Sequence, residues 1–280
     1  MFNIFKQLFI KKYKLYYFGG KKNKNAGDIY NIDLMNYFGI KYKRCRKIEK
    51  ANLICVGSNL DKLELPSKQK ITIIGSGFIF PPLGKDNINR NVNVLALRGN
   101  LSKQRIENAL NSSLVNCVLG DAGLLVSKIY PQEYKPIYKV GIIPHYCDKT
   151  GFDKSKIYLD ENEYKLIDIQ QDVKNVVQQI CECECILSSS LHGLIFADSY
   201  NIPNRQIILS DRIAGGCYKF EDYYSAFGLD LPEPINLKDE VINKSIITKV
   251  INSYTKKNIE VKQKELTKVM KIVGEKYAEL

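Results

Sequence analysis

The chain has 280 residues, of which 45% are hydrophobic, and its formal net charge at pH 7 is +12. This size and apolar content exclude a disordered chain and suit either one large α/β domain or two ordinary ones, of which we expect two. No apolar run reaches the roughly 20 residues that cross a bilayer, and the basic excess favours anionic partners such as phosphorylated small molecules or an acidic membrane surface.

The first predicted element is a basic and aromatic N-terminal segment, MFNIFKQLFIKKYKLYYF. Lysines interrupt its apolar part and no small-residue cleavage site follows, so we expect it to be retained rather than removed as a signal peptide. Its apolar side chains fit peripheral docking on an anionic membrane: Phe2, Phe5, Leu8 and Phe9. Packing of a helix against the protein body explains the same pattern equally well.

A glycine- and asparagine-rich loop then passes into an apolar-periodic helix. Residues 25–28 would lie at the N-terminus of this helix, where unpaired backbone N–H groups favour an anion. Compact apolar runs follow, each ending in glycine or a small polar or basic residue, at 51–56, 71–74, 94–97 and 115–119, with a helix at 102–110. Because such runs are typical of buried parallel strands, residues 1–135 are predicted to form a Rossmann-like domain with ligands at the carboxyl ends of its strands.

A second series of the same kind follows after two prolines. It consists of a strand at 138–143, a helix around 171–179, a strand at 183–187, a helix at 192–200 and a strand at 206–209. Residues 136–249 are therefore predicted to form a second Rossmann-like domain, which faces the first across a cleft. A basic C-terminal helix at 250–280 has apolar positions that either pack across the domains or lie on a membrane: Val261, Leu266, Met270 and Val273.

The eight cysteines do not predict a disulfide framework. Several lie in apolar runs, so we expect reduced, buried thiols and with them a cytoplasmic location. On a strand, the sulfurs of Cys181, Cys183 and Cys185 would stand about 7 Å apart. This spacing is too wide for one tetrahedral zinc, and no C-x-x-C pair occurs, so no metal site is expected.

The chain contains only two histidines, and each follows a predicted strand. His145 stands in GIIPHYCD, after a proline that fixes the preceding turn, and His192 stands in SSSLHGLIFAD, where a strand passes into a helix. Histidine titrates near neutral pH, so it can accept and release a proton there. A satisfied core or capping histidine is the competing interpretation.

Seven motifs follow one another along the chain: AGDIYN (26–31), GS (57–58), LRGNLS (97–102), LGDAGLL (119–125), GIIPHY (141–146), SSSLHGLIFAD (188–198) and KFEDYYSAFG (219–228). This ordered set resembles the polysaccharide pyruvyl transferase family. Many members of that family carry an arginine two residues before the second histidine, whereas this chain, like a subset of the family, has Ser190. The anion contact of that arginine must then come from another residue.

The resemblance implies an α/β fold of two Rossmann-like domains that face a cleft, as in GT-B glycosyltransferases. It also implies transfer of a pyruvyl group from phosphoenolpyruvate to a sugar, closing a ketal on two hydroxyls and releasing phosphate. Phosphoenolpyruvate is then a co-substrate, and no cofactor is expected. The saccharide acceptor in this class is often carried on polyprenyl diphosphate, so we expect a cytoplasmic protein at the inner face of the plasma membrane.

This reaction needs one group that delivers a proton to the methylene carbon and another that acts as base. We assign these catalytic roles to His192, His145 and Asp28. The donor phosphate and carboxylate require cations and hydrogen-bond donors, and the residues predicted to supply them are Ser188, Ser189, Ser190, Arg98, Arg212 and Lys219. The residues predicted to bind the acceptor are Asn25, Asn31, Asp121 and Tyr223. Helix capping is the competing role for Asp28, for Asp121 and for one of the three serines. A surface salt bridge is the competing role for Arg98, and core packing is that for Tyr223.

Two other functions suit the same architecture. A glycosyltransferase with a nucleotide-sugar donor would need an acidic residue for the ribose, for which Glu221 and Asp222 are candidates. A non-catalytic glycan- or anion-binding protein is the second alternative, motivated by Ser190. Nucleic acid is not expected as a partner, because none of its usual recognition motifs occurs.

Overall fold

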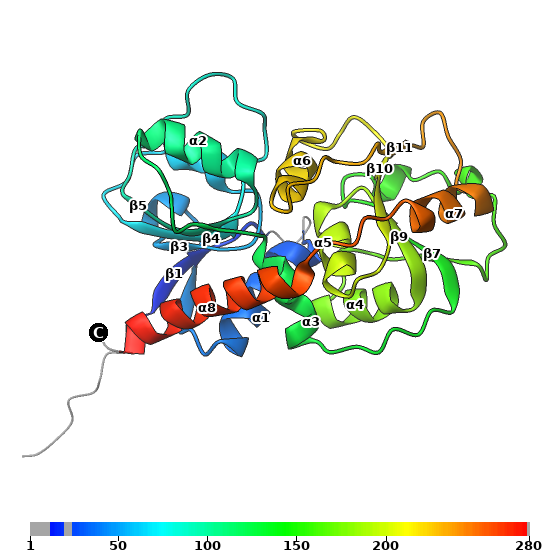
Figure 1. Cartoon of the computed structure of the whole chain (residues 1–280), viewed down its shortest axis with the longest axis horizontal. Helices are drawn as coiled ribbons and strands as arrows, with labels where there is room; N and C mark the ends of the chain where they lie inside the picture. The colour runs from blue at the N-terminus through cyan, green and yellow to red at the C-terminus, as the bar shows by residue number, and fades with distance from the viewer. Residues whose placement is uncertain (1–11, 20–23, 279–280) are drawn as a thin grey trace, which may run out of the picture.

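The computed structural model describes residues 12–19 and 24–278, which form two parallel β-sheets with flanking helices (Figure 1). The strands of the first sheet are β1 (Tyr13–Tyr16), β2 (Tyr42–Cys45), β3 (Leu53–Ile54), β4 (Ile71–Ser76), β5 (Val92–Leu97) and β6 (Val118–Leu119). They pair in the order β2-β1-β3-β4-β5-β6, and every pairing is parallel. β3 and most of β4 are buried, which explains their compact apolar runs.

The second sheet repeats this organisation. Its strands are β7 (Tyr138–Ile143), β8 (Tyr164–Leu166), β9 (Cys183–Ser188), β10 (Asn204–Ile208) and β11 (Ile235–Asn236). They pair in the order β11-β10-β9-β7-β8, again in parallel. The prediction of two Rossmann-like units is confirmed. The predicted strands at 51–56 and 115–119 are shorter than expected. The strands β1, β2 and β8 escaped the prediction because short runs rich in lysine and tyrosine carry little apolar signal, and β11 escaped it because it has only two residues.

Helices fill the space between the two sheets and cover their outer faces. The helices are α1 (Ala26–Tyr37), α2 (Asn100–Leu110), α3 (Val126–Ile129), α4 (Val173–Cys181), α5 (Leu191–Ser199), α6 (Tyr218–Ser225), α7 (Lys244–Asn252) and α8 (Ile259–Ala278). In Figure 1, α1, α3 and α5 lie between the two sheets. Buried residues of these helices belong to one apolar cluster with residues of both sheets, so the two halves share a continuous core.

The C-terminal helix returns to the first half of the chain. The sequence predicted one helix that begins at residue 250, and this start is wrong. Residue 250 belongs to α7, which ends at Asn252, and the C-terminal helix α8 begins at Ile259. Leu266 and Met270 are buried in the shared core, and the Gln263 side chain donates a hydrogen bond of 2.7 Å to the Leu124 carbonyl. Of the two roles considered for this helix, the structure shows packing across the domains (Figure 1).

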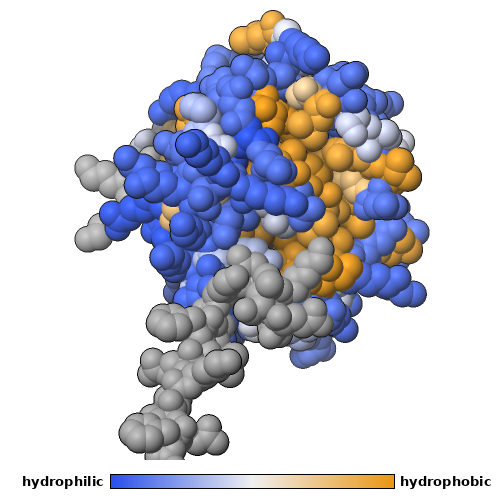
Figure 2. Space-filling view, turned by 90° about the vertical axis from the view of Figure 1, so that its left-hand side faces the viewer, coloured by the Kyte–Doolittle hydropathy of each residue, from blue (hydrophilic) through white to orange (hydrophobic). Residues whose placement is uncertain are grey.

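The outer side of the first domain is less completely covered. It faces the viewer in Figure 2, which shows apolar side chains among hydrophilic ones. The first four residues of β5 and both residues of β6 are only half-buried. Within the described ranges, 12–19 and 24–278, no helix has both the length and the apolar character that a membrane span requires. The predicted docking residues Phe2, Phe5, Leu8 and Phe9 lie outside these ranges.

Candidate active site

A cavity of about 380 Å³ opens between the two domains at the carboxyl ends of their strands. Its lining residues are Phe18, Asn25, Asp28, Ser58, Asn59, Asp61, Lys62, Glu64, Ile79, Phe80, His145, Tyr146, Ser190, Leu191, His192 and Lys219. The buried part of this lining, formed by His192, Ser190 and Lys219 with the half-buried His145, is called the inner end below. The exposed part, formed by Phe18, Glu64 and Phe80 with the half-buried Asp61 and Lys62, is called the mouth.

The two histidines meet because their strands are neighbours. β7 and β9 are paired with Ile143 opposite Ser188, so the segments that follow both strands emerge side by side. His145 and His192 both line the cavity, as the strand-end positions predicted. The backbone N–H of His145 donates a hydrogen bond of 2.8 Å to the Ser189 hydroxyl, which ties the two segments together.

His192 lies at the start of α5 and reaches across to the first domain. A Cβ atom added to Gly27 would lie 2.0 Å from the His192 ring, so only glycine leaves room for the imidazole at this place. The side chain keeps 8% of its surface, and its Nε2 atom has no hydrogen-bond partner within the described part of the chain. Burial, aided by the nearby Arg98 and Lys219 cations, lowers the pKa of His192 to about 3. The ring is therefore neutral at physiological pH.

His145 is held differently, by its own loop. Its Nδ1 atom accepts a hydrogen bond of 3.3 Å from the Cys147 N–H, which leaves Nε2 as the protonated nitrogen of the neutral ring. The ring also contacts Tyr146, with 4.2 Å between the ring centroids. Burial and the charge of Lys219 lower the pKa of His145 to about 4, against the opposing charge of Asp148.

The three serines after β9 have separate places. The Ser188 hydroxyl contacts the carbonyls of Ile143 and Ser190 and accepts from the Ser190 N–H, so it braces the turn. The Ser189 hydroxyl donates to the buried Asp148 carboxylate at 2.9 Å. Of the three, only Ser190 lines the cavity, where its side chain makes no capping bond to α5. Ser188 and Ser189 thus stabilise the turn after β9 and do not line the cavity.

On the opposite wall, the N-terminus of α1 presents a carboxyl group to the cavity. The Asn25 side chain, predicted to bind the acceptor, lines the cavity and accepts a hydrogen bond of 2.9 Å from the Gly27 N–H, which caps the helix. Asp28 follows one residue after Gly27. Desolvation by the surrounding protein raises its pKa to about 7, although the Lys219 and Lys62 ammonium groups pull in the opposite direction. The carboxyl group is half-protonated near neutral pH and suits proton transfer.

Lys219 brings a cation to the inner end. It lies on the first turn of α6 and keeps 7% of its surface. Desolvation and the charge of Arg98 lower its pKa to about 8, whereas Asp28 acts in the opposite direction. The ammonium group is thus mostly charged at neutral pH and lies in a site with reduced solvent screening.

Several residues predicted to bind substrate do not line the cavity. Arg98 is fully buried in an ion pair with Asp222, Arg212 is exposed beside Ser210, and Asp121 caps the turn at Gly123. The Asn31 amide pairs with both backbone groups of Val56. Tyr223 lies in the core, where its hydroxyl donates to Asp198. Apart from the exposed Arg212, each of these side chains stabilises the fold through buried contacts, and Asp121 and Tyr223 follow the capping and core interpretations.

Sequence reasoning missed the first-domain wall between residues 58 and 80. Gly57-Ser58 was recognised as a strand end, but the following 3-10 helix η2 (Leu60–Glu64) carries no apolar period. Asp61 accepts hydrogen bonds from the N–H groups of Ile79 and Phe80 and so fixes the adjacent loop. Among the residues described, no cluster of three or more His, Cys, Asp or Glu side chains has metal-binding geometry, and all eight cysteines are free.

Two parallel α/β domains with a cationic, imidazole-lined cavity between them define a class of two-domain Rossmann-like proteins. Within that class, the chain belongs to the polysaccharide pyruvyl transferase family, whose model matches residues 1–207. The predicted family is confirmed.

Two similar proteins align with more than three quarters of this chain. Protein L143 of Acanthamoeba polyphaga mimivirus is 29% identical over 234 residues, which cover 79% of this chain and 76% of that protein. The succinoglycan biosynthesis protein ExoV of Rhizobium meliloti (strain 1021) is 24% identical over 220 residues, which cover 76% of this chain and 65% of ExoV.

Among solved structures, protein KP1_0663 from Klebsiella pneumoniae is 14% identical, with a TM-score of 0.46 over 80% of this chain and 92% of that one. A variant of the wall teichoic acid polymerase TagF is 12% identical, with a TM-score of 0.44 over 96% of this chain and 89% of that one.

Proposed function

We propose that this protein transfers a pyruvyl group from phosphoenolpyruvate to a sugar of a saccharide precursor, forming a ketal and releasing phosphate. The observation that carries the proposal is the convergence of His192, His145 and Lys219 at the inner end of one cavity, with Asp28 on the opposite wall. The family membership of the chain supports the same reaction class.

The inner end suits an enol phosphate that bears two anionic groups. Lys219 supplies a poorly screened positive charge, and Ser190 with the N-terminus of α5 supplies hydrogen-bond donors. The buried Nε2 atom of His192 has no partner among the residues that the structure describes, so a ligand there would satisfy it. Lys219 thus supplies the positive charge that many family members place on an arginine at the position of Ser190.

The proposed reaction conserves atoms and electrons as follows. The methylene carbon of phosphoenolpyruvate accepts a proton, and the electron pair of its double bond forms the new C–H bond. A sugar hydroxyl attacks the carbon that bears the phosphate and loses its proton to a base. A second hydroxyl then displaces phosphate, which leaves with the electrons of its C–O bond and accepts the proton of that hydroxyl, and the ketal closes.

The protonation states favour a division of roles. His192 and His145 are neutral in the empty cavity, and a bound dianionic donor would raise the pKa of both rings because it stabilises the imidazolium form. Asp28, with a pKa of about 7, is suited to accept the proton of the attacking hydroxyl. We assign proton delivery to a histidine charged by the donor and base catalysis to Asp28.

The acceptor would enter from the mouth. Phe18 and Phe80 offer aromatic faces on which a sugar ring can stack, and Asn25 and Glu64 offer hydrogen-bonding groups. The acceptor we propose is carried on polyprenyl diphosphate, which would bring the protein to the inner face of the plasma membrane. The reaction uses phosphoenolpyruvate as co-substrate and needs no further cofactor.

The decisive experiment incubates the protein with a lipid-linked oligosaccharide and either phosphoenolpyruvate or sugar nucleotides. We expect phosphate release and a mass gain of about 70 units on the acceptor, as the ketal requires. A His192→Asn variant serves as the inactive control. Release of nucleotide from a sugar nucleotide would instead establish a glycosyltransferase, and binding without any turnover would establish a binding protein. Glu221 and Asp222, the ribose-binding candidates of that alternative, do not line the cavity.

A further inference from the structure

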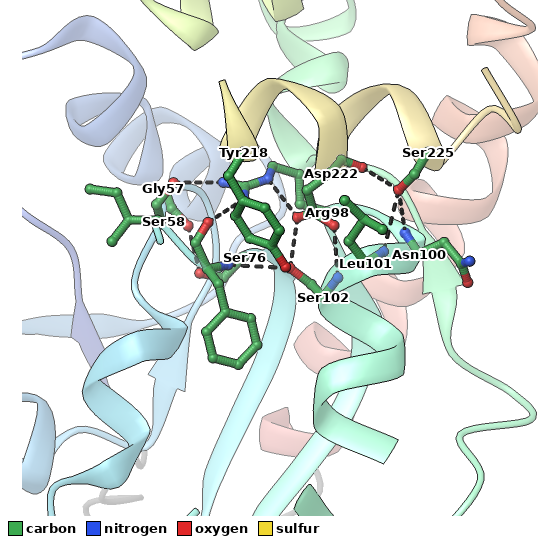
Figure 3. A network of polar contacts seen from close by, with 12 residues as sticks. Gly57, Ser58, Ser76, Arg98, Asn100, Leu101, Ser102, Tyr218, Asp222 and Ser225 are labelled. Carbon is green, nitrogen blue, oxygen red and sulfur yellow. Dashed lines mark hydrogen bonds and ion pairs between the residues drawn. The ribbon is translucent and has the colours of Figure 1, made fainter. Parts of the chain in front are cut away.

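Helix α6 lies in sequence between β10 and β11 of the second sheet, yet its side chains bind to the first domain (Figure 3). The Asp222 carboxylate accepts hydrogen bonds of 2.8 and 2.6 Å from the backbone N–H and the hydroxyl of Ser102. The Ser225 hydroxyl accepts from the N–H groups of Asn100 and Leu101, at 2.8 and 3.3 Å. These amides belong to the first turn of α2, whose N-cap residue, a glycine, has no side chain to cap them. The side chains of α6 therefore cap α2 across the domain boundary.

A buried ion pair completes this contact. The Arg98 Nε atom lies 2.9 Å from the Asp222 carboxylate, and both side chains are almost fully buried. The same guanidinium donates to the Phe78 carbonyl and, at 2.6 Å, to the hydroxyl of Ser58, which lines the cavity. Arg98 thus joins α6 directly to the first-domain wall of the cavity, as Figure 3 shows.

The two helices approach each other as closely as the backbone allows. A Cβ atom added to Gly99 would lie 1.6 Å from the Asp222 carbonyl oxygen, so any other residue would push α6 away. Gly215, with a φ of 75°, precedes α6, and a Cβ there would lie 1.8 Å from the Ile79 carbonyl oxygen. The position of α6 is therefore set by contacts with the first domain on both sides of its first turn.

Lys219 lies one helical turn before Asp222 on this helix, and its side chain lines the inner end of the cavity. We propose that Asp222 and Ser225 are positioning residues, which hold α6 on α2 so that the Lys219 ammonium group reaches the donor. This inference rests on the proposed function for the role of Lys219, but the placement of the lysine can be measured without any substrate.

The test compares two serines that make the same kind of contact. Ser225 on α6 and Ser199 at the end of α5 each accept a hydrogen bond from a backbone N–H of the first domain. Ser225→Ala removes the bonds to Asn100 and Leu101, and Ser199→Ala removes a larger set of bonds to Leu124, Ser127 and Gln263, but only the first loosens the helix that carries Lys219. Ser225→Thr keeps the hydroxyl and serves as the conservative rescue.

The readout without substrate is the labelling of Lys219 by an amine-reactive acetylating reagent, quantified by peptide mass spectrometry over a range of pH. The titratable and charged groups that interact electrostatically with Lys219 come from α1, from the end of β5, from the loop after β7 and from α5. They are Asp28, Arg98, His145, Cys147, Asp148 and His192. In the parent protein, half-maximal labelling is expected near the Lys219 pKa of about 8. In Ser225→Ala we expect a shift toward the ordinary lysine value of about 10.4, because Lys219 leaves its desolvated place.

The second readout is kinetic. Ser225→Ala should raise the KM for phosphoenolpyruvate roughly 3- to 10-fold, with kcat changed less than about twofold, as expected for a weakened ground-state contact. Asp222→Asn should act in the same direction and more strongly, since it also leaves the Arg98 charge unpaired. Ser199→Ala and Ser225→Thr should match the parent in both readouts.

The outcomes separate this inference from the function on which it builds. If Ser225→Ala labels at the same pH as Ser199→Ala and the parent, α6 does not depend on this contact and the positioning role is refuted. If the labelling shifts but phosphoenolpyruvate is not turned over by the parent, the positioning role stands and the proposed reaction fails. Because Ser225 is half-buried at the end of α6, the Ala variant tests the contact even if Asp222→Asn does not fold.

Discussion

At the inner end of the cavity, His192 and Lys219 keep 8% and 7% of their surface, whereas Phe18 and Phe80 at the mouth keep 36% and 48%. At the inner end the two domains are in close contact. The His192 ring packs on Gly27, and Lys219 lies on α6, which is hydrogen-bonded to the first domain. The mouth is built from side chains on a 3-10 helix and loops. The geometry of the inner end can change only if the domains shift, whereas the side chains of the mouth can change position without such a shift.

The two regions also differ in charge. The inner end combines Lys219 with two neutral imidazoles, so it suits a small anion. The mouth holds Asp61, Lys62 and Glu64 together, and the Asp61 carboxylate is occupied by backbone N–H groups. This contrast predicts that donor binding and chemistry depend on the inner end, whereas choice of acceptor depends on the mouth.

The largest effect is expected from Gly27→Ala. The new methyl group would meet the His192 ring at 2.0 Å, so the imidazole must leave its place. Turnover should fall by at least about 100-fold, the usual contribution of a general acid or base, and overpacking should destabilise the fold by about 1–3 kcal/mol. Phosphate release and thermal unfolding measure the two effects. Gly274→Ala on α8, where a Cβ meets only ordinary contacts, is the control, and equal activity of the two variants would contradict the arrangement.

Lys219→Met should come next. This substitution removes a charge-assisted contact between the lysine and the donor. Such a contact contributes about 1.5–3 kcal/mol, so its loss should raise the KM for phosphoenolpyruvate roughly 10- to 100-fold. The matched variant is Lys62→Met, which removes a cation bonded to the Tyr16 hydroxyl. It should leave the KM for phosphoenolpyruvate within about threefold of the parent, as expected for a charge that is less deeply buried. Similar effects of the two substitutions would show that the donor is not confined to the inner end.

The pH dependence tests the same assignment through Asp28 and Lys219. A base must be deprotonated, so kcat/KM for phosphoenolpyruvate should rise as pH passes upward through the Asp28 pKa of about 7. Lys219 must be charged, so the same quantity should fall as pH passes through about 8. In Asp28→Asn the acidic limb should disappear, whereas the alkaline limb should remain and move to lower pH, because the Asp28 charge no longer raises the Lys219 pKa. An unchanged acidic limb in that variant would assign it to another group.

Much of the inner end was predictable, because strand ends and helix caps leave local signals. The small residues after β9, the Asn25 cap and the two histidines after paired strands all follow from short stretches of sequence. The pairing of Arg98 with Asp222 did not, since 124 residues separate them and a buried arginine after a strand looks like a cleft residue until its partner is known. The first-domain wall at Asp61 and Phe80 was missed for a different reason: it is held by carboxylate-to-backbone bonds, which have no periodic pattern.

The smallest effect is expected from Phe80→Ala at the mouth. The backbone of Phe80 is fixed from both sides, by Asp61 at its N–H and by Arg105 at its carbonyl, so the substitution removes the ring without moving the loop. Loss of stacking against a sugar should raise the acceptor KM roughly 3- to 10-fold and leave the phosphoenolpyruvate KM unchanged. Leu83→Ala on the same loop removes a fully exposed side chain that does not line the cavity. An equal rise in acceptor KM in that variant would show that the loop acts through an outer surface, and the mouth would then lose its role in selecting the acceptor.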